Sequence, residues 1–251
     1  MSKIMANRIK IMNTEIDNLT MREAIREMDR MIKDGGTHYV VTPNVDHIVR
    51  LEKDIGLQKA YSEADLILTD GKPLLWISRL YGNPIKEKVS GSDLFPLLCR
   101  LAAHRGYKMF FLGAAEGVAD LAAENLRRKN KGLKICGTYS PPQGFENDRV
   151  QCDQIIERIK ETNPDILIVA LGCPKQEYFI HKYRKRLNVP LSLGLGASLD
   201  FEAGTVTRAP KWMQLHGLEW LYRILQEPRR MLKRYLVNDI SIFPLVLKYS
   251  R

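Results

Sequence analysis

The sequence predicts an α/β protein with a mostly parallel sheet and helices on both of its faces. Short apolar segments alternate with amphipathic segments from the N-terminus to about residue 204. Residues 165–171, Asp-Ile-Leu-Ile-Val-Ala-Leu, are almost continuously apolar, which is typical of a parallel strand buried on both faces. Most apolar segments run into turns rich in glycine, proline and polar residues. These observations favour an α/β domain over residues 1–204 and a basic helical appendage over residues 205–251.

The elements of the first half follow from local signals. Thr20 and Glu23 form a capping box that opens a helix ending near Lys33. Asn44 can cap the next helix, and Pro73 suits the first turn of another. The strands expected along the whole chain are 9–12, 38–41, 66–69, 108–112, 133–139, 165–171 and 190–195.

The second half begins with a helix that Ser92 or Asp93 can cap and that Gly106 closes. Later helices are expected over 148–162 and after residues 117 and 174, and an earlier one over 57–64. The alternation of strand and helix indicates that these elements extend the same sheet.

Two strands predicted to be neighbours end in polar turns that contain proline. Residues 66–69 run into Asp70-Gly71-Lys72-Pro73, and residues 38–41 run into Thr42-Pro43-Asn44. Because ligands bind outside the carboxyl ends of the strands in open α/β sheets, Asp70, Thr42 and Asn44 are candidate site residues. The structural alternative is that Asp70 belongs to an ordinary turn and that Asn44 only caps its helix.

A glycine-containing turn from Gly113 to Gly117 leads out of the strand 108–112 into a helix. Amides at a helix N-terminus attract phosphate, so Gly113 is a candidate for binding a nucleotide diphosphate. The full G-x-G-x-x-G pattern is absent, and the strand 133–139 ends without an acid that could hold a ribose. The sequence therefore disfavours a Rossmann-type NAD(P) or methyl-donor enzyme.

Bulk composition limits the class of protein and its compartment. The 251 residues carry a formal net charge of +10, which suggests an anionic partner. The four cysteines are scattered without zinc-site spacing, which indicates a reduced, cytosolic protein. We expect no signal peptide and no membrane-spanning segment, and hence a soluble or peripheral protein.

Basic and aromatic residues concentrate in the C-terminal segment, residues 205–251. From Arg208 onward there are nine Lys and Arg against three Asp and Glu, so this segment carries over half of the net charge. Pro244 divides the last apolar run, 240–247, which favours lying on an anionic membrane over crossing it. Helices packed on the core, a dimer interface in a homo-oligomer and nucleic-acid binding are the alternatives.

A series of motifs runs through nearly the whole chain in a fixed order. They are Thr42-Pro43-Asn44 with Asp46-His47, Thr69-Asp70-Gly71, Val89-Ser90-Gly91-Ser92-Asp93, Phe111-Leu112-Gly113 with Gly117-Val118-Ala119, Gly172 with Pro174-Lys175-Gln176-Glu177, Gly196-Ala197 with Asp200, Ala203-Gly204, Arg208-Ala209-Pro210 with Trp212, Gly217-Leu218-Glu219-Trp220, and Glu227-Pro228 with Arg230. Together they resemble the WecG/TagA/CpsF family of bacterial glycosyltransferases, and most closely its wall teichoic acid branch.

The resemblance implies an inverting transfer of N-acetylmannosamine from UDP-N-acetylmannosamine to the 4-hydroxyl of undecaprenyl-diphosphate-linked N-acetylglucosamine. It also implies a cytoplasmic enzyme that is peripheral on the inner face of the cell membrane and binds no nucleic acid. Users of UDP-N-acetylmannosaminuronate or another UDP-hexose share these motifs, so the donor sugar stays open. Outside glycosyl transfer, the alternative is a basic nucleic-acid-binding protein with a Rossmann-like fold.

Site residues follow from the same resemblance. Asp70 matches the proposed catalytic base, and Thr42 and Asn44 match positions that contact substrate. Gln176 lies in the Pro-Lys-Gln-Glu motif, which implies contact with donor or acceptor. Lys88 stands where we expect arginine in many relatives. Lysine keeps the positive charge but cannot form the bidentate hydrogen bonds that a guanidinium makes to phosphate.

The leaving diphosphate needs its developing charge stabilised. The sequence has no D-x-D motif, so we expect a metal-independent enzyme without a cofactor. Helix N-termini and basic side chains, with Arg223, Arg229 and Arg230 as candidates from the C-terminal segment, would neutralise the UDP.

Five remaining residues are assigned structural roles from the sequence. His47 has no partner acid that the sequence identifies, and Cys173 is a small residue at the end of a strand. Glu177 can cap its own helix. Asp200 and Arg208 are expected to form a structural pair where the C-terminal segment begins.

Overall fold

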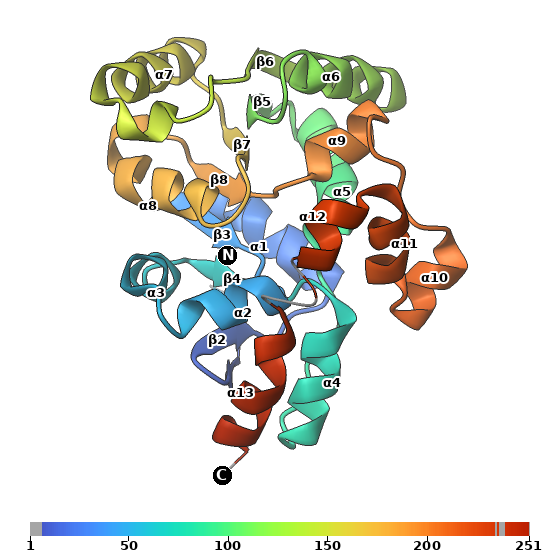
Figure 1. The fold of residues 1–251 in the computed structure, drawn as a ribbon. Helices are drawn as coiled ribbons and strands as arrows, with labels where there is room; N and C mark the ends of the chain where they lie inside the picture. The colour runs from blue at the N-terminus through green and yellow to red at the C-terminus, as the bar shows by residue number, and fades with distance from the viewer. Residues whose placement is uncertain (1–6, 234, 236–238, 251) are drawn as a thin grey trace.

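The computed structural model describes residues 7–233, 235 and 239–250, without the side chains of residues 215, 230 and 233. Its centre is a six-stranded sheet in the order β4-β3-β8-β7-β5-β6, in which every neighbouring pair is parallel. Helices cover both faces of the sheet (Figure 1). The expected fold class is confirmed.

Apart from β2, the strands lie close to the ranges expected from the sequence. They are β1 (Arg8–Ile11), β2 (Thr14–Asp17), β3 (His38–Val41), β4 (Leu66–Ile67), β5 (Lys108–Gly113), β6 (Lys134–Tyr139), β7 (Ile166–Ala170) and β8 (Leu191–Gly194). The four residues of β3 and the five of β7 include no Asp, Glu, Lys or Arg, which is consistent with strands covered on both faces.

Helices follow most of the strands and continue after the last one. They are α1 (Met21–Lys33), α2 (Val45–Leu51), α3 (Ile55–Ser62), α4 (Lys72–Leu80), α5 (Gly91–Arg105), α6 (Val118–Lys129), the 3-10 helix η1 (Phe145–Asn147), α7 (Arg149–Thr162), α8 (Lys175–Leu187), α9 (Ser198–Ala203), α10 (Lys211–His216), α11 (Glu219–Gln226), α12 (Pro228–Lys233), the 3-10 helix η3 (Asp239–Ser241) and α13 (Ile242–Tyr249). The capping box of Thr20 and Glu23 at the start of α1 is confirmed.

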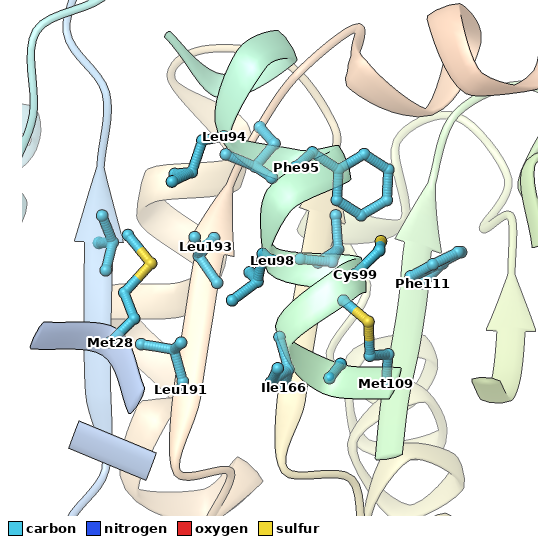
Figure 2. Close-up of a cluster of buried hydrophobic side chains, with 14 of the residues drawn as sticks. Met28, Leu94, Phe95, Leu98, Cys99, Met109, Phe111, Ile166, Leu191 and Leu193 are labelled. Atoms are coloured by element: carbon cyan, nitrogen blue, oxygen red, sulfur yellow. The ribbon is translucent and has the colours of Figure 1, made fainter. Parts of the chain in front are cut away.

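The hydrophobic core consists of two clusters, one on each face of the sheet. Helices α1, α5, α6 and α9 cover one face, and α2, α3, α4, α7 and α8 cover the other. Figure 2 shows α5 in front of the strands, with Leu94, Phe95 and Leu98 in one cluster with side chains of the strands such as Leu193, Ile166 and Phe111. The rings of Phe95 and Phe111 meet edge to face at 5.5 Å. This packing fixes α5, and therefore the loop before it, against the sheet.

Two local predictions needed correction. The sequence predicted a single N-terminal strand, but β1 pairs with β2 in an antiparallel hairpin. Its turn, Met12-Asn13, has a positive φ at Met12 and contains no glycine, so the usual hairpin signal is missing. The N-cap of α5 is Ser90, not Ser92 or Asp93, and its hydroxyl donates to Asp93 Oδ2 at 2.6 Å.

The C-terminal segment folds back over the body of the protein (Figure 1). Helices α11 and α12 lie near α9 and α5, α10 lies on the outer side of α11, and α13 runs alongside α4 and α2. Tyr81 Oη at the end of α4 donates to the Val246 carbonyl in α13 at 3.0 Å. Across the described residues, every helix is too short or too polar to cross a bilayer.

Candidate active site

A cavity of about 660 Å³ opens at the carboxyl ends of β3, β4, β7 and β8. The turns after these four strands form its floor and walls. Arg223, Glu227 and Met231 from α11, α12 and the residue between them line it from the C-terminal segment. Because β8 lies between β3 and β7, segments far apart in the sequence converge here. The cavity therefore lies at the edge of the sheet where the sequence placed the candidate residues.

Asp70 lies in this cavity, directly after β4. Its backbone N–H donates to the Pro43 carbonyl at 2.8 Å, so the turns after β3 and β4 are held together as predicted. Burial raises the pKa of the Asp70 carboxyl above its ordinary value, and Glu219 raises it further, whereas Lys88, Arg223 and His47 lower it. A carboxylate held in this way can accept a proton from a bound hydroxyl group.

Thr42 and Asn44 also line the cavity, as predicted. Asn44 precedes α2 as its N-cap, which confirms the expected structural role, and Thr42 is buried. His47 Nδ1 lies 2.8 Å from Asn44 Oδ1. Asn44 therefore both caps α2 and lines the cavity, so its structural role is compatible with a role in binding substrate.

His47 has the acidic partner that the sequence did not reveal. Its Nε2 lies 3.4 Å from Glu177 Oε1, and both side chains are buried. Glu177 was expected to cap its own helix, but its carboxylate turns inward, where the Gln176 amide donates to Oε1 at 2.8 Å. The two residues are 130 positions apart, so local sequence patterns do not indicate the pair.

Gln176 borders the cavity but is already engaged by the protein. Its Oε1 accepts the Gly196 N–H at 3.0 Å, and its Nε2 donates to Glu177. A Cβ on Gly194 would lie only 2.9 Å from Gln176 Nε2, so glycine is needed for this close approach. Gln176 therefore braces β8 and the following turn, whatever contact it makes with a substrate.

Lys88 does not line the cavity, although it lies next to Asp70. Its ammonium pairs with Asp93 Oδ2 at 2.9 Å and Glu219 Oε2 at 3.6 Å. Burial opposes the charge on Lys88, but Asp93 and Glu219 outweigh it and raise the pKa of Lys88. In turn, burial of Asp93 is outweighed by Ser90, Lys88 and Arg208, which lower the pKa of Asp93 to about 2.

Gly113 lies outside the cavity lining, at the end of β5. Its φ is +110°, and a Cβ there would lie 2.5 Å from the Ala170 carbonyl oxygen of β7. The close approach of two strands accounts for this glycine. Gly113 therefore packs against Ala170, which itself lines the cavity, and phosphate binding by the turn from Gly113 to Gly117 stays a prediction.

The arginines of the C-terminal segment differ in how the structure places them. Arg223 lines the cavity, and its guanidinium lies 5.2 Å from the ring centroid of Phe201, another cavity residue. Arg229 is exposed at the start of α12. Arg230 also belongs to α12, but its side chain is outside the described part of the structure.

Arg208 was expected to pair with Asp200 but is engaged by two other carboxylates. Its Nη2 lies 2.8 Å from Asp93 Oδ1 and 3.6 Å from Glu219 Oε1. Asp200 lines the cavity instead, together with Phe201. The sequence assigned no role to Phe201 or Glu219. Their contacts with Arg223 and with Lys88 are made between residues distant in the sequence.

One group of side chains in the described structure offers three different ligand atoms to a metal ion. His47, Cys173 and Glu177 place a nitrogen, a sulfur and an oxygen within 4.8 Å of one another. Cys173, expected only as a small residue after a strand, lines the cavity. Nitrogen and thiolate ligands favour zinc over magnesium, so this set differs from the carboxylates that hold magnesium beside a diphosphate.

Comparison with known proteins assigns the chain to a family. Residues 9–251 match the family model described as "Glycosyl transferase WecG/TagA/CpsF family". An N-acetylglucosaminyldiphosphoundecaprenol N-acetyl-beta-D-mannosaminyltransferase of Bacillus spizizenii is 35% identical over 213 residues, covering 85% of this chain and 80% of the relative.

Two further relatives carry the same name. The protein from Bacillus subtilis is 36% identical over 178 residues, which cover 71% of this chain and 67% of the relative. The protein from Staphylococcus aureus is 24% identical over 226 residues, which cover 89% and 87%. The chain therefore belongs to the WecG/TagA/CpsF family of glycosyltransferases.

Proposed function

We propose that this enzyme transfers N-acetylmannosamine from UDP-N-acetylmannosamine to the 4-hydroxyl of undecaprenyl-diphosphate-linked N-acetylglucosamine, with inversion, in wall teichoic acid linkage-unit synthesis. The names of the relatives support the acceptor and the transferred sugar. The observation that carries the proposal is Asp70, a carboxylate of raised pKa in a cavity of about 660 Å³.

The proposed reaction is a single displacement. Asp70 accepts the proton of the acceptor hydroxyl while that oxygen forms a bond to the anomeric carbon of the donor. The bond from the anomeric carbon to the diphosphate oxygen breaks on the opposite face, and UDP leaves with the electron pair. Thr42 and Asn44 border the same cavity, which supports a role for them in contacting the sugars. One base and one displacement account for inversion.

We propose that no divalent metal takes part, and that basic side chains neutralise the leaving UDP. Arg223 borders the cavity, and Lys88 lies close enough to Asp70 to lower its pKa. Arg230 stays a candidate for the same task. Charged donors beside a developing oxyanion stabilise the transition state more than the ground state.

Exposed apolar side chains support docking on the inner face of the cytoplasmic membrane. Trp76 and Leu80 are exposed one turn apart on α4, and Phe243 and Leu247 are exposed one turn apart on α13. These two helices lie side by side (Figure 1). Together with the excess of basic residues in the C-terminal segment, they suit an anionic bilayer that presents a lipid-linked acceptor.

The decisive experiment is a UDP-release assay with a lipid-diphosphate-linked N-acetylglucosamine acceptor. We expect wild-type activity with UDP-N-acetylmannosamine to survive EDTA, and Asp70→Asn to reduce kcat by about 10²–10⁴-fold because the base is lost. The matched control is Asp153→Asn on α7, which removes an exposed ion pair with Arg186 of α8 and should retain activity.

Other outcomes of this assay have separate meanings. Preference for UDP-N-acetylmannosaminuronate would correct the donor but keep the mechanism. Loss of activity in EDTA that zinc or magnesium restores would contradict the metal-independent reaction. Full activity of Asp70→Asn would remove Asp70 as the base and return it to the role of a turn residue.

A further inference from the structure

Four charged side chains form a closed ring beside Asp70. Lys88 Nζ lies 2.9 Å from Asp93 Oδ2 and 3.6 Å from Glu219 Oε2. Arg208 Nη2 lies 2.8 Å from Asp93 Oδ1 and 3.6 Å from Glu219 Oε1. Each carboxylate thus contacts both cations, and the two formal charges of each sign cancel. Lys88 is the most enclosed member, with 15% of its side chain exposed.

The ring joins two parts of the chain that are distant in sequence. Lys88 and Asp93 flank the start of α5, whereas Arg208 and Glu219 belong to the C-terminal segment. Glu219 is the first residue of α11, the helix that also carries Arg223 into the cavity. Anything that fastens Glu219 to the body therefore also fixes the position of Arg223.

The body side of the ring is tied to the proposed base. Val89, next to Lys88, donates its N–H to the Thr69 carbonyl at 2.9 Å, and Thr69 directly precedes Asp70. The charges of Lys88, Arg223 and His47 lower the pKa of Asp70. Burial and the charge of Glu219 raise it. Glu219 both adds a negative charge near Asp70 and offsets the charge of Lys88.

We infer that Glu219 is a positioning residue that fastens the C-terminal segment over the cavity through Lys88 and Arg208, and so controls both the placement of Arg223 and the charge around Asp70. This inference rests on the proposed function for its effect on catalysis. The fastening itself is a property of the folded chain. Glu219 acts without touching the substrate, because it does not line the cavity.

The fastening is tested by hydrogen exchange of the α11 amides, measured by mass spectrometry on the full chain. We expect Glu219→Gln to speed this exchange about fivefold, because partly exposed ion pairs each contribute modestly. Lys88→Met should do the same, and the double variant should be less than additive because the two residues share one contact. Glu157→Gln, which removes a surface partner of Lys160 on α7, is the control. Unchanged α11 exchange in Glu219→Gln would overturn the inference.

The effect on Asp70 is tested by the pH profile of kcat/KM. Removing the negative charge of Glu219 lowers the pKa of Asp70, so the acid limb should move to lower pH in Glu219→Gln. A purely structural role that displaces Arg223, whose charge lowers the pKa of Asp70, would leave the limb in place or move it to higher pH, and either result would overturn the electrostatic part. If the wild type releases no UDP from any donor, the proposed function fails, while hydrogen exchange still decides whether Glu219 fastens the segment.

Discussion

The folded protein disfavours the charged form of the Asp70 carboxyl group. Burial raises its pKa, and the neighbouring Lys88 and Arg223 offset only part of that effect. The folded state therefore binds the Asp70 proton more tightly than the unfolded chain does. It follows that the free energy of unfolding falls as the pH rises from the unfolded pKa of Asp70 through its higher folded pKa, and that the loss is complete above the folded pKa.

We therefore expect Asp70→Asn to raise stability at neutral pH while it abolishes most activity. The neutral amide avoids the cost of a buried charge, and the gain should shrink as the pH falls and Asp70 becomes protonated. Urea unfolding of both proteins at pH 7 and near pH 4 measures this difference. A variant less stable than the wild type at pH 7 would show that the charge of Asp70 is well compensated.

At the scale of single elements, Gly113 at the end of β5 illustrates a glycine that close packing of two strands requires. Gly113 has a φ of +110° and faces the Ala170 carbonyl of β7 across a gap that a Cβ cannot enter. Gly82, after α4, also has a positive φ, but a Cβ there meets open space. A side chain at either position would strain a backbone of positive φ. Only at Gly113 would it also clash with a neighbouring strand.

Gly113→Ala should lower the free energy of unfolding by about 2–3 kcal/mol, from backbone strain together with overpacking between two strands. Gly82→Ala is the matched control and should cost about 1 kcal/mol, from the left-handed backbone alone. Chemical denaturation measures both. If Gly113→Ala instead kept full stability and raised the KM for the UDP-sugar, the result would support phosphate binding by this turn and contradict a purely structural role of Gly113.

At the scale of the whole molecule, the C-terminal segment supplies cavity residues, exposed apolar side chains and half of the charged ring. Arg223, Glu227 and Met231 border the cavity, and Phe243 and Leu247 are exposed on α13. Substrate binding and membrane docking are therefore expected to depend on the same segment.

Removal of residues 205–251 should abolish both binding to anionic vesicles and UDP release, because the cavity loses Arg223 and the membrane face loses α13. Vesicle sedimentation and the transfer assay measure the two losses, with thermal unfolding to establish that the remaining body is folded. The full-length variant Phe243→Ser/Leu247→Ser, altered only at exposed positions, should lose vesicle binding alone when the acceptor is water-soluble. A fully active truncated enzyme would contradict this dependence.

The sequence was sufficient for the features that short stretches of chain decide. The apolar run of β7, the capping box of α1 and the polar turns after β3 and β4 each depend on neighbours within a few residues. Hence the fold class and the position of Asp70, Thr42 and Asn44 at one edge of the sheet could be predicted. The resemblance carried by the motifs added the family. It did not separate Gly113, which packs between strands, from the residues that border the cavity.

Only the tertiary structure decided which distant side chains meet. His47 and Glu177 are 130 positions apart, and Lys88 and Glu219 are 131 positions apart, yet each pair lies within 4 Å. The hairpin of β1 and β2 lacks a glycine signal, and Arg208 reaches Asp93 where Asp200 was expected. The physical reason is that propensity, capping and periodicity act over a few residues, whereas ion pairing and desolvation depend on how the helices pack on the sheet. The charge around Asp70 is therefore a property of the folded molecule.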